Sequence, residues 1–210
     1  MAMIFWLTVA FGTSVLGNNN SELVNLSKSD TKKLIGGEIV ITESRETENT
    51  EQTYSLNALI NAPIKVVYDV IVDYESYNDF MPNIENVEVT EISDSTSYMD
   101  YTILLPLNYK KYYRVRMLHK FTETEANISW KLVKYPTYIE PVKTIRNTTG
   151  YWTLSKYEDS DYTTLLEYHI YTDPGEIPFG CGWIVDFLTK QQLPNILNAL
   201  RNRVSQITKE

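Results

Sequence analysis

The sequence predicts an α+β fold in which a long C-terminal helix lies across an antiparallel β-sheet. Runs of alternating apolar and polar residues, separated by polar turns, fill most of the chain between residues 38 and 172. Prolines and glycines are then concentrated in residues 173–182, where they end the last strand and let the backbone turn sharply. Beyond them, apolar residues recur every three or four positions as far as Ile207. This spacing predicts a helix with one buried face.

The N-terminal segment, residues 1–17, is expected to be a signal peptide. It is almost entirely apolar or small from Ile4 to Gly17, and the first charged side chain is Glu22. The run is shorter than the roughly 20 apolar residues that span a bilayer, and its small residues suit a cleavage site. We therefore expect export, to the periplasm or outside the cell. An uncleaved membrane anchor, or a buried N-terminal helix in a cytoplasmic protein, is the alternative.

The predicted domain occupies residues 36–210 and follows a polar segment, residues 18–35, that is expected to be helical or loose. Two strands are predicted first, at 38–48 and 53–61. Pro63 suits the first turn of a helix that runs to about Val72, and a short helix is predicted at 74–80. Six antiparallel strands follow, at 84–93, 97–105, 109–122, 126–135, 148–156 and 163–172. The C-terminal helix is predicted from Trp183 to about Ile207.

Composition excludes several classes of function. The formal net charge of −8 argues against a general nucleic-acid-binding surface, which requires clustered excess Lys and Arg. The two histidines and the single cysteine, Cys181, form no metal-binding spacing, so neither a metal nor another cofactor is expected. No nucleophile elbow or Gly-rich phosphate loop occurs. We therefore expect no catalytic residue and a protein that is not an enzyme.

One local basic segment departs from the acidic average. Its cations are Lys110, Lys111, Arg114 and Arg116, with Lys120 nearby. They are interleaved with Tyr109, Tyr112 and Tyr113. Such a segment suits contact with anionic lipid headgroups. The alternative is the solvated face of an ordinary strand.

Several ordered motifs resemble one known family. The run Ile60–Val70, followed by Asp73, Tyr74 and Asn78, contains an Ala-Pro before a helix and an Asp and an aromatic residue at its end. Pro106 with Lys110, then Gly150 with Trp152, and finally the run Asp173–Pro178, continue the pattern. These motifs resemble START-like domains, the steroidogenic-acute-regulatory-related lipid-transfer domains, over about residues 36–204. Two positions depart from the pattern, because Lys111 replaces an acidic residue and Glu176 replaces a glycine.

The resemblance implies the helix-grip fold, in which a curved antiparallel sheet is wrapped around a long C-terminal helix and encloses an apolar cavity. Alternation along the strands, and the apolar face of the helix, then select the side chains that face the cavity. They are Tyr101, Tyr113, Met117, His119, Trp130, Trp152, Leu166, Tyr168, Phe187 and Leu188. For the residues on the strands, ordinary core packing is the alternative, and for His119 it is a hydrogen-bonded core histidine.

The function implied by the resemblance is the binding of a hydrophobic ligand, a lipid or sterol, and its transfer. We expect the C-terminal helix and the loop 173–182 to gate entry of the ligand into the cavity. The protein is expected to be a monomer. Trp183, Phe179 and the basic segment would make transient membrane contact. Two alternatives use the same cavity. One is a polyketide cyclase or aromatase with Tyr113, His119 or Tyr168 as acid or base, and the other is a quinone-binding chaperone.

Overall fold

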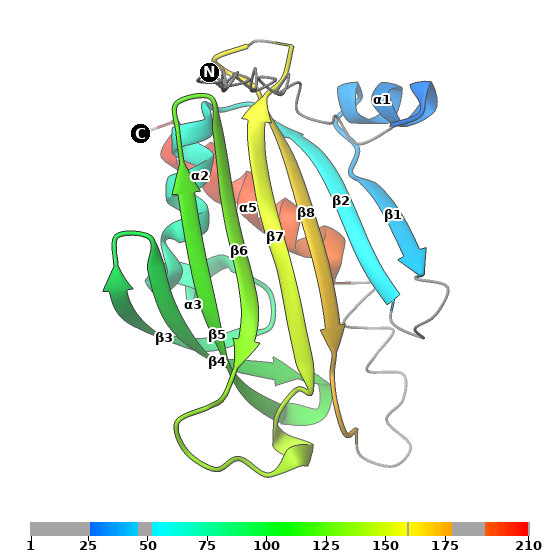
Figure 1. The fold of residues 1–210 in the computed structure, drawn as a ribbon. Helices are drawn as coiled ribbons and strands as arrows, with labels where there is room; N and C mark the ends of the chain where they lie inside the picture. The colour runs from blue at the N-terminus through cyan, green and yellow to red at the C-terminus, as the bar shows by residue number, and fades with distance from the viewer. Residues whose placement is uncertain (1–25, 46–51, 159, 178–191, 210) are drawn as a thin grey trace, which may run out of the picture.

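The computed structural model describes residues 26–45, 52–158, 160–177 and 192–209. Within them, eight antiparallel strands form one sheet in the order β1-β2-β8-β7-β6-β5-β4-β3 (Figure 1). The strands are β1 (Val40–Arg45), β2 (Gln52–Ile60), β3 (Ile84–Ser93), β4 (Thr96–Leu105), β5 (Tyr109–Phe121), β6 (Glu125–Val133), β7 (Asn147–Lys156) and β8 (Thr164–Asp173). The α+β fold with a curved antiparallel sheet, predicted from the sequence, is confirmed.

The predicted strand boundaries agree with the observed ones to within one or two residues, apart from the end of β1, which adjoins the undescribed residues 46–51. The agreement reflects the strict alternation of these strands. In β7, for example, Thr148, Gly150, Trp152 and Leu154 are buried, whereas Asn147 and Thr149 are exposed. Side chains that are alternately buried and exposed are typical of a strand with one face against the core.

The sheet combines local and long-range pairing. The strands from β3 to β8 pair consecutively, as a meander. In contrast, β2 pairs with β8, and Leu56 lies opposite Tyr168. The helices α2 (Ile64–Val72) and α3 (Tyr77–Phe80), joined by a short turn of 3₁₀ helix, carry the chain from β2 to the opposite edge of the sheet at β3.

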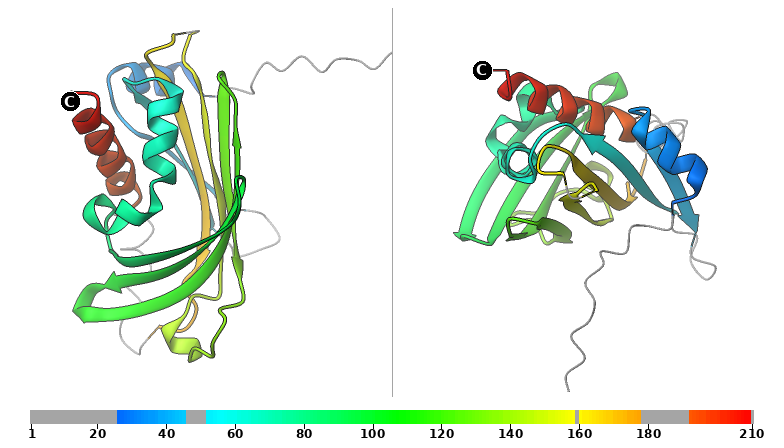
Figure 2. Two further views of the ribbon diagram at one scale, coloured as in Figure 1. Left: turned by 90° about the vertical axis from the view of Figure 1, so that its left-hand side faces the viewer. Right: turned by 90° about the horizontal axis from the view of Figure 1, so that it is seen from above.

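The helices α2, α3 and α5 (Leu193–Ile207) all lie on one side of the sheet, and β3 and β4 curve beneath them (Figure 2). The apolar residues of α2 and α5 are buried there against the sheet. Val67, Ile71, Leu197 and Leu200 are all fully buried or nearly so. The spacing of these residues on each helix is the three-to-four-residue period that predicted the helices.

Part of the C-terminal prediction falls outside the described residues. The helix was predicted from Trp183, and its described part, α5, begins at Leu193. Pro194 occupies its first turn. Backbone N–H groups there have no partner within the helix, so the lack of an N–H on proline costs no hydrogen bond. The predicted signal peptide, residues 1–17, also lies outside the described residues.

The N-terminal helix α1 (Lys28–Ile35) lies within the polar segment that was expected to be helical or loose. Ser27 caps it, because its hydroxyl accepts a hydrogen bond from the backbone N–H of Asp30. Gly37 follows the helix with φ +84°, a left-handed conformation that glycine adopts without strain. Arg201 of α5 donates to the carbonyls of Gly37 and Leu59, which fixes this end of the molecule to the C-terminal helix.

Candidate ligand-binding cavity

A cavity lies between the inner face of the sheet and helix α5, in two adjoining chambers. Both chambers are lined by Pro82, Tyr113, Thr148 and Ile196. We call them the rim chamber, of about 150 Å³, and the aromatic chamber, of about 140 Å³. Together they come close to the lower limit of about 300 Å³ for small-molecule sites.

Stacked rings form the wall of the aromatic chamber. The Trp152 ring lies 4.0 Å from the Tyr168 ring, centroid to centroid, and the Trp130 ring also stacks with Tyr168, at 5.8 Å. Tyr101 and Tyr113 form a second stack, with centroids 5.1 Å apart. These pairs arise from strand register, because Trp152 lies opposite Tyr168 and Tyr101 opposite Tyr113. The remaining described lining residues are Tyr77, Met81, Pro82, Ile84, Val115, Met117, Thr148 and Ile196.

Gly150 makes room for one of these rings. It lies opposite Trp130 in the β6–β7 pair. A Cβ atom at this position would come within 2.3 Å of both the Trp130 ring and the carbonyl oxygen of His169. Because no real Cβ approaches other atoms so closely, only glycine permits the indole to cross the neighbouring strand here. The indole N–H is 3.3 Å from the Thr148 hydroxyl, to which it donates.

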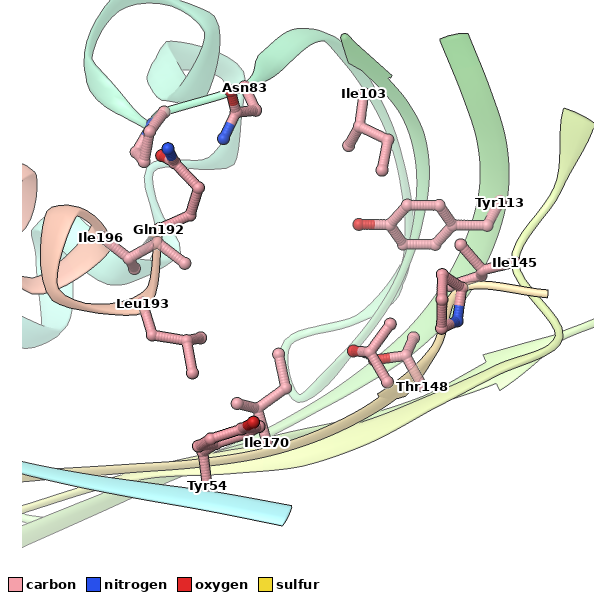
Figure 3. A pocket seen from close by; sticks show the side chains of 13 residues that line it. Tyr54, Asn83, Ile103, Tyr113, Ile145, Thr148, Ile170, Gln192, Leu193 and Ile196 are labelled. Carbon is pink, nitrogen blue, oxygen red and sulfur yellow. The ribbon is translucent and has the colours of Figure 1, made fainter. Parts of the chain in front are cut away.

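The rim chamber is apolar but carries several polar groups (Figure 3). Figure 3 shows the Tyr113 ring extending from β5 toward the chamber with its hydroxyl foremost. Tyr54 of β2 lies beside Ile170, its cross-strand neighbour on β8. The amides of Asn83 and Gln192 and the hydroxyls of Thr148 and Thr172 also line this chamber. The other described lining residues are Pro82, Ile103, Ile145, Pro174, Leu193 and Ile196.

Burial keeps the cavity tyrosines in the neutral form. Desolvation raises the pKa of Tyr101, Tyr113 and Tyr168 well above the usual value of 10.0. At physiological pH these side chains are therefore neutral groups that donate or accept hydrogen bonds. They are poorly matched to acid–base catalysis, which works best when a pKa lies near the working pH.

Lys111 corrects the interpretation of the basic segment. Its side chain is not part of a solvated face but is 1% exposed. The ammonium donates to the carbonyls of Thr144 at 2.7 Å, Pro174 at 2.5 Å and Glu176 at 2.9 Å. Burial lowers the pKa of Lys111, as expected for a desolvated cation. Three carbonyl acceptors satisfy all three donors of an ammonium group.

The same carbonyls belong to the two loops that border the rim chamber. Arg146 pairs with Asp173 through its side chain at 2.9 Å, and its N–H donates to the Asp173 carbonyl at 3.0 Å. Gly175, with φ +71°, lies so close to Thr144 and Arg146 that a Cβ would meet backbone atoms of both at 3.2 Å. The described part of the predicted gating loop, residues 173–177, is therefore tied to the segment 144–146.

Two other cations of the basic segment have acidic partners. Lys110 forms an ion pair with Glu85 at 2.6 Å, and Arg114 is bonded to Asp100 through two nitrogens. Tyr98 and Tyr135 flank the Arg114 guanidinium, at 5.7 and 5.8 Å from their ring centroids. These ion pairs reduce the positive potential that the sequence alone indicated.

The structure brings six of the ten predicted site residues together in the aromatic chamber: Tyr101, Tyr113, Met117, Trp130, Trp152 and Tyr168. Leu166 is fully buried in the core and lines neither chamber. Phe187 and Leu188 lie outside the described residues.

His119 lies at a different place, in a polar hollow between α2, the turn after it and strands β3–β5. Its Nε2 is 2.7 Å from the hydroxyl of Tyr74, to which it is hydrogen-bonded. The hollow is also lined by Asp73, Glu75 and Asp94. His119 is thus a hydrogen-bonded histidine outside both chambers. It is half-buried in a polar hollow, whereas the alternative interpretation placed it in the core.

The cavity also contains residues that the sequence prediction missed. Tyr54 follows the same alternation as Leu56 and could have been found from it, had the pairing of β2 with β8 been known. Asn83 and Gln192 carry no signal in the sequence, because Asn83 occupies a left-handed turn (φ 63°) and Gln192 precedes α5. Only the tertiary fold places them at the rim chamber.

Within the described ranges, no three His, Cys, Asp or Glu side chains are grouped so as to hold a metal ion. Nor does any helix in the described part of the chain have the length and apolar character needed to cross a bilayer.

Comparison with solved structures shows the same fold in START-related proteins. The STAR-related lipid transfer protein from Xanthomonas axonopodis superposes with a TM-score of 0.67 at 18% identity, covering 80% of this chain and 93% of that one. Human StAR-related lipid transfer protein 5 gives 0.68 at 14% identity, with 82% and 84% covered. The Zhui aromatase/cyclase from Streptomyces sp. R1128 gives 0.57 at 13% identity, with 80% and 94% covered.

At these identities the structural likeness establishes the fold, and it confirms the START-like resemblance and the helix-grip fold. No curated protein matches this chain in sequence. The sequence model of one family, described as polyketide cyclase / dehydrase and lipid transport, matches residues 60–201. This range includes α2, the sheet from β3 to β8 and most of α5. The chain therefore belongs to the polyketide cyclase/dehydrase and lipid transport family.

Proposed function

We propose that the protein binds one hydrophobic molecule of the lipid or sterol class in the two-chamber cavity and carries it without chemical change. The chemistry of the walls is the observation that carries this proposal. Among the described residues that line either chamber, tyrosine is the one titratable type. Burial raises the pKa of Tyr113 and Tyr168, so these phenols suit orientation of a ligand better than proton transfer.

Membership of the family supports binding of a hydrophobic ligand. Burial of the ligand's apolar surface in the cavity would supply the free energy of binding. Removing apolar ligand surface from water contributes about 2.5 kcal/mol per 100 Å². The loss of translational and rotational freedom opposes binding by about 4–15 kcal/mol. A ligand must therefore fill both chambers to bind well, and the stacked Trp and Tyr rings offer the large, rigid contact area that makes this effective.

We propose α5 as the gate through which the ligand enters. Ile196 of α5 lines both chambers, and Leu193 lines the rim chamber. The opposite border, residues 173–177, is tied to the rest of the sheet through Lys111 and Arg146. Displacement of α5 would open the cavity without breaking the buried hydrogen bonds of Lys111. The loop 173–182 was expected to gate together with the helix. Because its described part, residues 173–177, is tied to the sheet, we assign the movement to α5.

A cavity-filling variant tests the proposal. Ile196→Trp adds a large ring where the two chambers meet, whereas Ile92→Trp makes the same change at a position that is 57% exposed on the edge strand β3. Binding of radiolabelled cholesterol, phosphatidylcholine and ubiquinone would be measured for both variants and for the wild type. We expect Ile196→Trp to reduce binding of the preferred ligand at least tenfold, and Ile92→Trp to leave it unchanged. Equal binding by all three proteins would rule out the cavity as the site.

The catalytic alternative has a separate test. A cyclase or aromatase would need an acid or base in the cavity, and His119 is hydrogen-bonded to Tyr74 outside it. Under the carrier proposal, His119→Ala leaves ligand affinity unchanged, and any ligand extracted after incubation has its original mass and chromatographic retention time. A ligand whose mass or retention time changes during incubation, at a rate that Tyr113→Phe or Tyr168→Phe lowers, would establish an enzyme instead.

The quinone-chaperone alternative differs from the lipid-carrier proposal only in ligand. The same binding measurements separate the two, because ubiquinone is one of the ligands tested. Preference for ubiquinone over cholesterol and phosphatidylcholine would identify the protein as a quinone binder.

A further inference from the structure

The Tyr54 hydroxyl is the one cavity group in the described structure that is both fully buried and unpaired. The side chain is 4% exposed, and its hydroxyl oxygen is inaccessible and makes no hydrogen bond. Tyr54 lines the rim chamber from β2. A buried polar group without a partner is destabilising, and native proteins retain very few of them.

Several other tyrosine hydroxyls in the described residues have partners. Tyr77 donates to the carbonyl of Ile71 at 2.5 Å, and Tyr151 donates to the carboxylate of Glu167 at 3.1 Å. The two tyrosines of the rim chamber differ, because neither Tyr54 nor Tyr113 has a hydrogen bond from its hydroxyl within the described residues. Of these two, only the Tyr54 hydroxyl is also fully buried.

The two chambers differ in which of their polar groups are already bonded. In the aromatic chamber, the Trp130 N–H has a partner in Thr148 and the Tyr77 hydroxyl has one in the carbonyl of Ile71. The rim chamber offers the Tyr54 and Tyr113 hydroxyls together with the amides of Asn83 and Gln192 (Figure 3). An apolar pocket with a few polar groups at one end orients an amphipathic ligand in one direction.

We infer that Tyr54 is a specificity-determining residue that donates a hydrogen bond to a ligand oxygen. The ligand class is an amphipathic ring compound whose hydroxyl or carbonyl oxygen lies in the rim chamber, with its apolar rings in the aromatic chamber. The inference rests on the proposed function and adds the orientation and the chemistry of the ligand's polar end. A site built to bond an oxygen discriminates strongly against the analogue without it, because the site's buried group is then left unpaired.

The test uses Tyr54→Phe and a pair of probes that differ in one oxygen, 2-naphthol and naphthalene. Affinities would be measured by isothermal titration calorimetry, and thermal unfolding would be followed without ligand. Tyr162→Phe, at a position that is 77% exposed, is the matched control. We expect wild-type protein and Tyr162→Phe to prefer 2-naphthol about tenfold, which is the worth of one hydrogen bond. Tyr54→Phe should abolish this preference, leave naphthalene affinity unchanged, and raise the unfolding temperature of the empty protein.

The possible failures are distinguishable. An equal loss of affinity for both probes in Tyr54→Phe would mean that the ring matters and the hydroxyl does not. An undiminished preference for 2-naphthol in the variant would likewise overturn the inference. Both results leave the proposed function standing, because naphthalene still binds the wild type. Failure of both probes to bind the wild-type protein would contradict the proposed function and this inference with it.

Discussion

Replacing Lys111 with Met removes a buried charge while keeping most of the side chain's volume. In the wild type, the ammonium bonds the carbonyls of Thr144, Pro174 and Glu176. A hydrogen bond to a charged group contributes about 1.5–3 kcal/mol, and desolvation of the ammonium offsets several kcal/mol of that total. Because the variant leaves three carbonyls without their donor, we expect a net loss of about 2–4 kcal/mol in unfolding free energy.

Urea unfolding measures this loss, and hydrogen exchange locates it. In a domain of this size, 1 kcal/mol shifts the melting temperature by about 2–4 °C. The melting temperature of Lys111→Met should therefore fall by roughly 5–15 °C, and the amides of residues 173–177 should exchange faster. Lys110→Met is the control, because that neighbouring lysine has a partly exposed ion pair worth less than about 1 kcal/mol. If the two variants were equally stable and exchanged alike, Lys111 would not hold the loop.

Three further predictions concern the wall, the tyrosines and membrane contact. Gly150→Ala should destabilise the fold by about 1–3 kcal/mol in urea unfolding, because its Cβ would overlap the Trp130 ring; a change below about 0.5 kcal/mol would contradict the packing described. Burial raises the pKa of Tyr113 and Tyr168 above 10.0, so the stability they contribute is complete below pH 10 and is lost as pH rises further. Absorbance at 295 nm should therefore show these phenols ionising only together with unfolding, and ionisation near pH 10 in folded protein would be inconsistent with their burial. Finally, Trp183→Ala should slow ligand transfer between vesicles, and an unchanged rate would argue against membrane docking through this residue.

The alternation of apolar and polar residues was sufficient to predict the strands and many of the residues that line the cavity. Alternation along β5 placed Tyr113, Val115 and Met117 on the inner face, and all three line the aromatic chamber. A stretch of strand with one face buried tolerates only one register, so the residues themselves determine it. The START-like resemblance then supplied the curvature and the position of the helix, which alternation does not contain.

Lys111 shows where local reasoning failed. It shares the inward register of Tyr113, so alternation alone places it inside. Its charge instead suggested a solvated position, because lysine is almost never fully buried without partners. The partners here are carbonyls of Thr144, Pro174 and Glu176, far along the chain, and only the folded sheet brings them to the lysine.

His119 and Tyr54 show the limits of strand register in predicting a site. His119 continues the inward series of β5, but at its position the strand has passed the chambers and faces Tyr74 instead. Tyr54 lines the rim chamber because β2 pairs with β8 across more than a hundred residues of sequence. Such long-range pairing leaves no mark on the local pattern of either strand.

Native mass spectrometry of protein purified from Asn18 onward tests the central claim most directly. Anything bound would be extracted and identified by its fragmentation. Our account predicts a single hydrophobic molecule at one copy per chain in the wild type, absent from Ile196→Trp and retained in Ile92→Trp. Wild-type protein that is empty as purified, and that also fails to bind cholesterol, phosphatidylcholine and ubiquinone, would contradict the account.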